Sequence, residues 1–470
     1  MGTISSAFSI ATSALQANQS AISTIANNVA NANTDGYSRE TPNLTDNAPI
    51  IAGNISNGTG VRYTGSTSVR DRVLEQRLAQ QQQLASSSGA RLTALDQLQS
   101  LFSPSSGSSS SSGGDIGTDL TSFFNSFSSL EANPTSNALR QQVLSSATTL
   151  AGDVSNAAAS LNAQQAALDQ QATGVVSQVN SLTSAIAQLN QQIQSLPPGT
   201  DTGTLEDQRQ QDISQLSQLI GINQISTENN GLSITTTSGQ LLVSQASSFQ
   251  LSTGTSSGLT RFYINGTDVT TELADGGGEL GGYLTARDQD IPNALSALDQ
   301  LAYNISTAVN TQNNAGTDLA GDDGNAGDIF SQPTQVAGSA LSFSVVMTDP
   351  DHIAAAGLNA GTGDNSNATA LANLANQALI NGQSPTNYFS NFVSSLGSTV
   401  DQVQTENNAQ TASVTQLQNL RDSLSGVNLD EEAAALQQFQ RAYQAASQVF
   451  NILDTIMASV LNLGTQTAVS

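Results

Sequence analysis

The chain has 470 residues and a formal net charge of −25, from 37 acidic and 12 basic residues. This length is enough for about three domains. All the basic residues are Arg, and there is no Cys, no Trp and only one His. This composition excludes disulfides, thiolate and Schiff-base chemistry, and zinc or iron sites that need several His or Cys ligands.

Sparse positive charge on an acidic chain also argues against nucleic acid and acidic membrane surfaces as partners. No run approaches the roughly 18 apolar residues of a transmembrane helix. Residues 1–34 contain no charged side chain, so the basic region of a cleavable signal peptide is missing. No cofactor and no metal are expected, and we predict that the protein is not an enzyme.

The N-terminal segment has apolar residues at alternating spacings of three and four, which predicts a helix with one apolar seam. The seam is interrupted by Asn18, and its residues are Ile4, Phe8, Ala11, Leu15, Ile22, Ile25 and Val29. Such a stripe requires a partner helix. Alone, a helix of about 30 residues with an uncovered seam is expected to be marginally stable.

Further helical stripes follow along the chain. One contains Leu74, Leu78, Leu92, Leu95 and Phe102, and it leads into a Ser/Gly tract over 103–114 that is typical of a flexible loop. The longest stripe begins at Leu161 and continues to Leu196, before Pro197-Pro198-Gly199 ends the helix. Another contains Leu396, Val400, Val403, Val414, Leu417 and Leu424.

Between the helical halves the pattern favours strands. Alternation appears from Ile222 to about Arg287, and Asn265-Gly266 predicts a hairpin turn. Leu341–Met347 is a second run that favours a strand. The prediction is a mainly α protein with a β insertion.

The C-terminal segment repeats the first stripe, with Leu436, Phe439, Tyr443, Ala446, Phe450, Leu453, Met457 and Val460 in register. Two matching seams at opposite ends of one chain indicate that the ends pair with each other. We therefore expect an elongated, coiled-coil-like bundle of long helices.

Four groups could be mistaken for chemical sites. His352, in Asp349-Pro-Asp-His, is expected to start a short Ala-rich helix. The acidic loop with Asp318, Asp322, Asp323, Asn325 and Asp328 could hold Ca²⁺ but lacks the spacing of an EF-hand. Gly276–Gly282 lacks the order of a phosphate-binding loop. Asp430, Glu431 and Glu432 are expected to lie in the first turn of a helix, where carboxylates oppose the positive end of the dipole.

The termini carry a resemblance. Asn27-Asn-Val-Ala-Asn-Ala-Asn-Thr-Asp-Gly-Tyr-Ser-Arg39 resembles the signature of the axial proteins of the bacterial flagellum, and its Tyr-Ser-Arg ending is closest to hook–filament junction subunits. Near the other end, Ser425–Ala433 and Phe439–Ala446 resemble the C-terminal signature of the same family. Gly278–Gly282, Arg287–Ile291 and Thr348–Ala356 are similar to interior family motifs. The motif residues are Asn27, Asn28, Asn31, Asn33, Gly36, Tyr37, Ser38, Arg39, Gly426, Val427, Asn428, Leu429, Asp430, Glu431 and Glu432.

The sequence departs from this family at two places. Asp35 stands where many members have Pro. Only a short link joins the regions of Phe330 and Pro350, where longer members carry an additional β-domain, so a slimmer subunit is expected.

The resemblance implies a secreted structural subunit of the flagellum. It would leave the cell by type III export and join the hook to the filament as an adaptor ring. The implied partners are copies of itself, the hook protein, a second junction protein towards the filament, and an export chaperone.

We expect three domains. Residues 1–45 with 428–470 form a terminal helical domain that is disordered before assembly. Residues 46–221 with 281–427 form a helical bundle, and 222–280 form the β-rich insertion. The terminal seam residues, except Ala446, form the expected assembly interface. Two alternatives stay open: a hook protein or another axial subunit, and an extracellular enzyme whose activity lies in the insertion.

Overall fold

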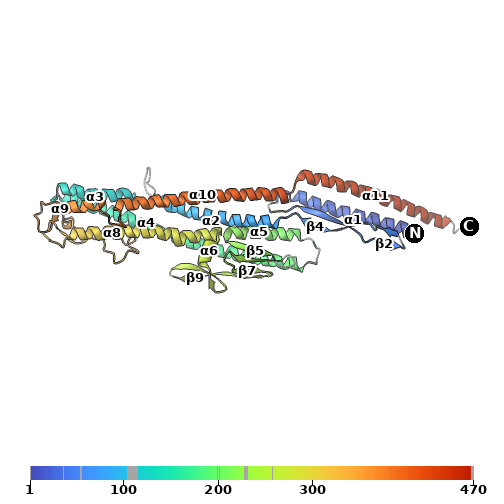
Figure 1. Cartoon of the computed structure of the whole chain (residues 1–470), viewed down its shortest axis with the longest axis horizontal. Coiled ribbons are helices and arrows are strands. Elements are labelled where there is room, and N and C mark those ends of the chain that lie inside the picture. Colours follow the sequence, from blue (N-terminus) through green and yellow to red (C-terminus); the bar gives the residue numbers. More distant parts are fainter. Residues whose placement is uncertain are drawn as a thin grey trace. The chain divides into compact units, whose positions relative to one another are not determined.

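The computed structural model describes residues 2–34, 36–52, 55–102, 115–197, 200, 202–226, 231–256 and 258–466. The tract 103–114, Pro198-Gly199 and Asp35 lie outside the described residues. The prediction of a mainly α protein with a β insertion is confirmed (Figure 1).

The chain divides into two compact units, each assembled from distant segments. Unit 1 comprises Met1–Gln83, Gln178–Leu251 and Thr411–Ser470, and unit 2 comprises Leu84–Ser177 and Ser252–Gln410. Three helices, α2 (Arg72–Phe102), α4 (Asn137–Ser195) and α10 (Pro385–Ser425), contribute to both units.

Unit 1 contains both chain ends. Helix α1 (Gly2–Ala30) is followed by a ribbon of β1 (Glu40–Asp46) and β4 (Val61–Ser68), which are antiparallel, and by the small hairpin of β2 (Ile50–Ala52) and β3 (Ile55–Asn57). The last helix, α11 (Leu429–Gln466), packs along α1.

The body of unit 1 is a sheet supported by helices α4 and α5 (Gly203–Leu219). Its order is β5 (Ile222–Ser226), β6 (Leu232–Thr236), β7 (Leu241–Ser244) and β8 (Ser247–Ser248). The buried side chain of Asn190 on α4 donates to the carbonyl oxygens of Leu232 (2.8 Å) and Gln245 (3.0 Å). Because these amide bonds satisfy backbone groups at the sheet, they fix α4 against it.

Unit 2 has an aromatic core. Helix α3 (Ile116–Ala132) begins where the carboxylate of Asp115 accepts from the amide of Thr118, and it buries Phe123 and Phe127. The ring centroids of Phe123 and Phe330 are 5.3 Å apart, in an edge-to-face arrangement. Helix α8 (Ile291–Asn314) and α9 (Ser366–Asn373) complete this core.

The rest of unit 2 consists of short elements. A sheet of β9 (Leu251–Ser256), β10 (Leu259–Ile264) and β11 (Thr267–Asp268) is followed by α6 (Thr270–Gly276), α7 (Gly278–Thr285) and a π-helical turn, Ala286–Asp290. The predicted Asn265-Gly266 turn joins β10 to β11, with φ of 51° and 80°. The strands β12 (Gly316–Thr317) and β13 (Ala356–Gly357) pair, and short 3₁₀ turns cover Pro350–His352 and Leu374–Asn376.

Two local predictions are wrong. Leu341–Met347 is irregular. Within the described residues, its β-pairing is a single isolated bridge between Phe330 and Val345. His352 ends a 3₁₀ turn instead of starting an Ala-rich helix. Ala354 and Ala355 instead have no regular secondary structure, because the side chain of Asn313 accepts from the Ala354 amide and the Ala355 carbonyl accepts from the amides of Asn367 and Ala368.

Candidate assembly site at the paired ends

The two helices that carry the predicted terminal seams pack against each other. Helices α1 and α11 lie side by side (Figure 1), and the rings of Phe8 and Phe450 meet with their centroids 4.4 Å apart. On α1, Ala11 and Ile25 are buried, whereas most other seam residues on both helices are half-buried. The structure therefore brings the two ends together, as the periodicity indicates.

Three of the predicted seam residues keep exposed side chains: Val29 (42% exposed), Tyr443 (38%) and Val460 (43%). Helix α11 also carries a second apolar stripe that the sequence reasoning missed. Val449, Ile452 and Ile456 are 50%, 59% and 43% exposed, and they lie on one face at spacings of three and four. Each of these residues directly precedes a residue of the predicted seam, so the stripe is hidden beside the stronger register of Phe450, Leu453 and Met457.

A polar contact, here called the clasp, joins the two terminal motifs. It consists of Asn28, Tyr37, Arg39, Glu431 and Glu432. The amide nitrogen of Asn28 donates to the carboxylate of Glu432 (3.0 Å) and to the Glu40 carbonyl (2.8 Å). The amide oxygen of Asn28 accepts from the Tyr37 hydroxyl (2.8 Å) and from the Glu40 backbone amide (3.0 Å).

The clasp also includes Arg39, the last residue of the first motif. The backbone amide of Arg39 donates to the Ser425 carbonyl (2.8 Å), and its guanidinium pairs with the carboxylate of Glu431. Asp430, Glu431 and Glu432 lie in the first turn of α11, and the Asn428 side chain accepts from the Asp430 amide. The second motif therefore starts α11 and holds the first motif at the same time.

The other motif residues have smaller roles. Asn27 and Asn31 are bonded to each other (3.0 Å), and Gly36 has a φ of 83°, a left-handed conformation that favours glycine. Ser38 is completely buried, whereas Asn33 and Leu429 are exposed and Gly426 and Val427 are half-buried at the bend before α11.

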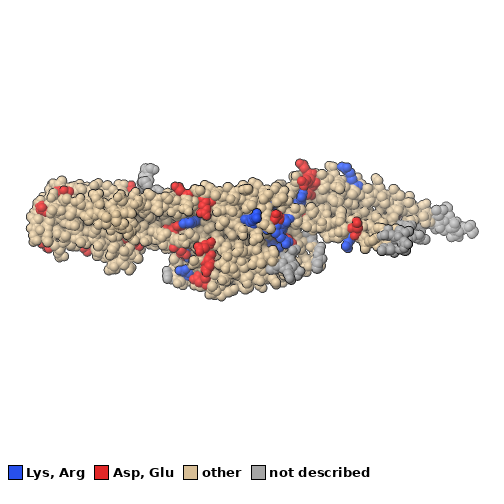
Figure 2. Space-filling model, in the orientation of Figure 1, with Lys and Arg blue, Asp and Glu red and all other residues tan. Residues whose placement is uncertain are grey.

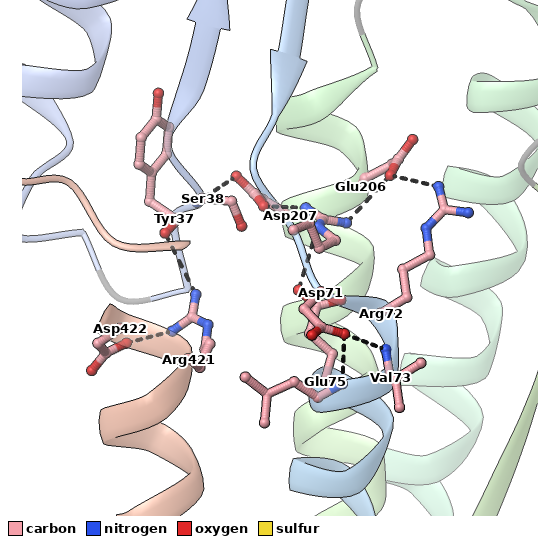
Figure 3. A network of polar contacts seen from close by, with 12 residues as sticks. Tyr37, Ser38, Asp71, Arg72, Val73, Glu75, Glu206, Asp207, Arg421 and Asp422 are labelled. Atoms are coloured by element: carbon pink, nitrogen blue, oxygen red, sulfur yellow. Dashed lines mark hydrogen bonds and ion pairs between the residues drawn. The ribbon is translucent and has the colours of Figure 1, made fainter. Parts of the chain in front are cut away.

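A charged cluster that the sequence analysis did not identify is made of Arg70, Arg72, Glu75, Glu206 and Asp207. Figure 3 labels Arg72, Glu75, Glu206 and Asp207. Arg70 pairs with Glu75 (3.3 Å), Glu206 (3.4 Å) and Asp207. The cluster reaches the first motif because the Ser38 amide donates to the Asp207 carboxylate (3.1 Å). The sequence signal was the dense charge of Arg70-Asp-Arg72 in a chain with few charges.

Burial and charge shift the pKa of Glu75 in this cluster and of Arg209 beside it. Burial raises the pKa of Glu75 to about 7, although the neighbouring guanidinium groups, Arg70 first, oppose the shift. Burial lowers the pKa of Arg209, which donates to the side-chain oxygen of Asn190, to about 10.

Comparisons with known proteins agree with this geometry. Three family models match: flagellar hook-associated protein FlgK helical domain at residues 95–330, flagella basal body rod protein at 8–37, and flagellar basal body rod FlgEFG protein C-terminal at 421–463. The two terminal matches contain Asn28, Tyr37, Glu431 and Glu432 of the clasp, and Arg39 lies two residues beyond the first match. Flagellar hook-associated protein 1 of Bacillus subtilis is 30% identical over 96% of both chains. The chain belongs to the flagellar hook-associated protein 1 family.

Other relatives support this assignment. Flagellar hook-associated protein 1 of Escherichia coli is 28% identical over 98% of this chain and all of that protein. The structure of the flagellar hook junction protein FlgK from Burkholderia pseudomallei has the same fold, with a TM-score of 0.65 and 20% identity over 74% of this chain and 100% of that chain. As a hook-associated protein, this chain is a structural component of the flagellum at the hook–filament junction.

The groups considered as possible chemical sites have structural contacts in this hook-associated protein. His352 Nδ1 lies 2.7 Å from the carboxylate of Asp318, which is buried, and 3.9 Å from the exposed carboxylate of Asp322. The hydrogen bond to Asp318 raises the pKa of His352. Asp323 bonds to Thr317, and Asp328 accepts from Asn314 (2.8 Å). Asn325 is exposed, and Gly276–Gly282 spans the junction of α6 and α7.

None of the helices in the described residues is both long and apolar enough to cross a membrane.

Proposed function

We propose that this hook-associated protein joins hook to filament through its paired ends. Residues 1–45 with 428–470 form the assembling domain, and the assembly interface is the set of seam residues predicted from the sequence. The observation that carries the proposal is the clasp, in which motifs about 400 residues apart satisfy each other's buried polar groups. Because neither motif can make these contacts alone, the two ends order together.

The exposed stripe of α11 supports contacts beyond the monomer. Val449, Ile452 and Ile456 are apolar and leave much of their surface in water, which is unfavourable by about 25 cal/mol per Å². On the face drawn in Figure 2, much of the surface over α1 and α11 is uncharged, apart from acidic and basic groups that lie mostly towards the start of α11. Such a surface fits the apolar helices of neighbouring subunits. Contacts of this heterologous type propagate helically or close into a ring.

The proposed partners follow from this arrangement. Copies of the chain self-associate in a ring or helical layer, with the hook protein on one side and a second junction protein on the filament side. The protein is secreted by type III export, during which a chaperone covers the apolar ends. Uncharged termini suit this route, because their apolar seams are completed only by contacts with neighbouring subunits after export.

Two experiments test the proposed function. A strain that lacks the protein should make hooks without filaments in electron micrographs, and gold-labelled antibody should mark the hook–filament junction in the parent strain. Label along the whole hook would favour a hook subunit instead. Normal filaments in the deletion strain would rule out the junction role.

A further inference from the structure

Glu75 connects the start of α2 to the charged cluster. It lies in the first turn of α2, where its side chain is 8% exposed, and its carboxylate is 3.3 Å from Nε of Arg70. Arg70 is equally buried and also pairs with Glu206 and Asp207. One guanidinium is therefore shared by three carboxylates, and any change in the charge of one alters the pairing of the others.

Asp207 transmits this pairing to the first motif. Its second carboxylate oxygen accepts from the backbone amide of Ser38 (3.1 Å), and the Ser38 residue is fully buried. The connection runs from Glu75 through Arg70 and Asp207 to Ser38, all within unit 1. Figure 3 labels Glu75, Asp207 and Ser38. Arg421 of α10 also reaches the motif, because its guanidinium donates to the Tyr37 carbonyl (3.5 Å).

We propose that Glu75 makes this attachment of the N-terminal motif sensitive to protons near neutral pH. When Glu75 is ionised, it competes with Asp207 for Arg70 and repels the Asp207 carboxylate. When Glu75 is protonated, Arg70 pairs fully with Asp207 and Glu206, and the Ser38 contact is firmer. The consequence for assembly rests on the proposed function, whereas the proton sensitivity is a property of the monomer.

The surrounding charges are consistent with a titration in this range. Burial is the largest effect and raises the pKa of Glu75, Asp207 also raises it, and the net pKa is about 7 with the opposing guanidinium groups included. Arg70, Arg421 and Arg72 lower it by smaller amounts. Arg209 of α5 also interacts electrostatically with Glu75.

The direction of the pH effect follows from linkage. The pKa of Glu75 is higher in the folded state than its ordinary value of 4.5. The stability contributed by the bound proton is therefore fully present below about pH 4.5 and is lost as the pH rises through about 7. The attachment should be firm at pH 6 and looser at pH 8.

An introduced thiol can report opening at the motif directly. The chain has no Cys, and the Ser38 hydroxyl is buried without a hydrogen-bond partner among the described residues, so Ser38→Cys places one thiol at the attachment. The rate at which a neutral reagent alkylates this thiol is measured from pH 6 to pH 8. At each pH this rate is divided by the rate for the urea-unfolded chain, so that the pH dependence of thiol ionisation cancels. Opening that fully exposes Glu75 should increase the normalised rate by up to about tenfold.

Matched variants identify the titrating group. Glu75→Gln should make the normalised rate independent of pH, whereas Asp454→Asn, an exposed site on α11, should leave the rise unchanged. A rise that persists in Glu75→Gln would overturn the proposal. If Glu75→Gln fails to fold, the test is the pH dependence of the normalised alkylation rate in the chain that retains Glu75. A rate that does not change between pH 6 and 8 overturns the proposal. Because monomers are measured, this result is independent of whether the protein joins hook to filament.

Discussion

At the scale of single residues, Asn28 uses both ends of its carboxamide within a buried site. It contacts the Glu432 side chain, the Tyr37 hydroxyl and both backbone groups of Glu40. Asn28→Ala should leave these buried polar groups unsatisfied and cost about 1–3 kcal/mol. The measurement is urea unfolding of the monomer at pH 7.

Asn27→Ala is the matched control for this prediction. Asn27 is the neighbouring amide in the same motif, but it is exposed, and we expect a change within about 0.5 kcal/mol. Equal effects of the two substitutions would show that the buried bonds of Asn28 do not stabilise the clasp.

The resemblance to flagellar axial proteins identified the residues of the clasp, but their partners in the charged cluster could not be predicted. Asp207 and Ser38 are 169 residues apart, and no periodicity connects a loop with the start of α5. A run of charged residues such as Arg70-Asp-Arg72 more often lies on the solvated surface than in a buried cluster. Only the fold shows that Arg70 and Glu75 are enclosed.

At the scale of elements, the pairing of α1 with α11 depends on their apolar seams. Leu15→Asp and Phe450→Asp each place a carboxylate in a seam that neighbouring subunits are proposed to complete. Because the seam is only half-buried in the monomer, we expect assembly to be abolished while the monomer's melting temperature changes by about 2 °C or less. Sedimentation and calorimetry measure the two effects.

Asn451→Asp adds the same charge to the same helix at an exposed polar position that is not at a spacing of three or four from Val449, Ile452 or Ile456, and it should assemble normally. A large loss of monomer stability in Phe450→Asp would mean that the ends are an ordinary core and not an assembly surface.

The long helices could be predicted because each repeats its apolar spacing over many turns. The two local errors, at Leu341–Met347 and after His352, have a common cause. In both places, contacts with residues distant in the sequence set the backbone. Asp299 accepts from the amides of Gly338 and Ala340 just before Leu341, and the side chain of Asn313 donates to the His352 carbonyl and accepts from the Ala354 amide. Such long-range polar contacts leave no periodic signal in the sequence.

At the scale of the whole molecule, the net charge of −25 belongs to the middle of the chain. Residues 1–34 carry no charged side chain, and residues 433–470 carry one Arg and one Asp. The absence of Cys and Lys excludes disulfide, thiolate and Schiff-base chemistry. It is also consistent with a chain whose function depends on neutral, apolar ends.

The most direct test of the paired-ends account is removal of residues 430–470 and examination of the flagella by electron microscopy. The deletion removes nearly all of α11 and the second half of the clasp but leaves unit 2 intact. We expect a soluble, folded protein by circular dichroism and hooks that end without filaments, while the full chain restores filaments in the same strain. Normal filaments and motility with the truncated chain would contradict the account.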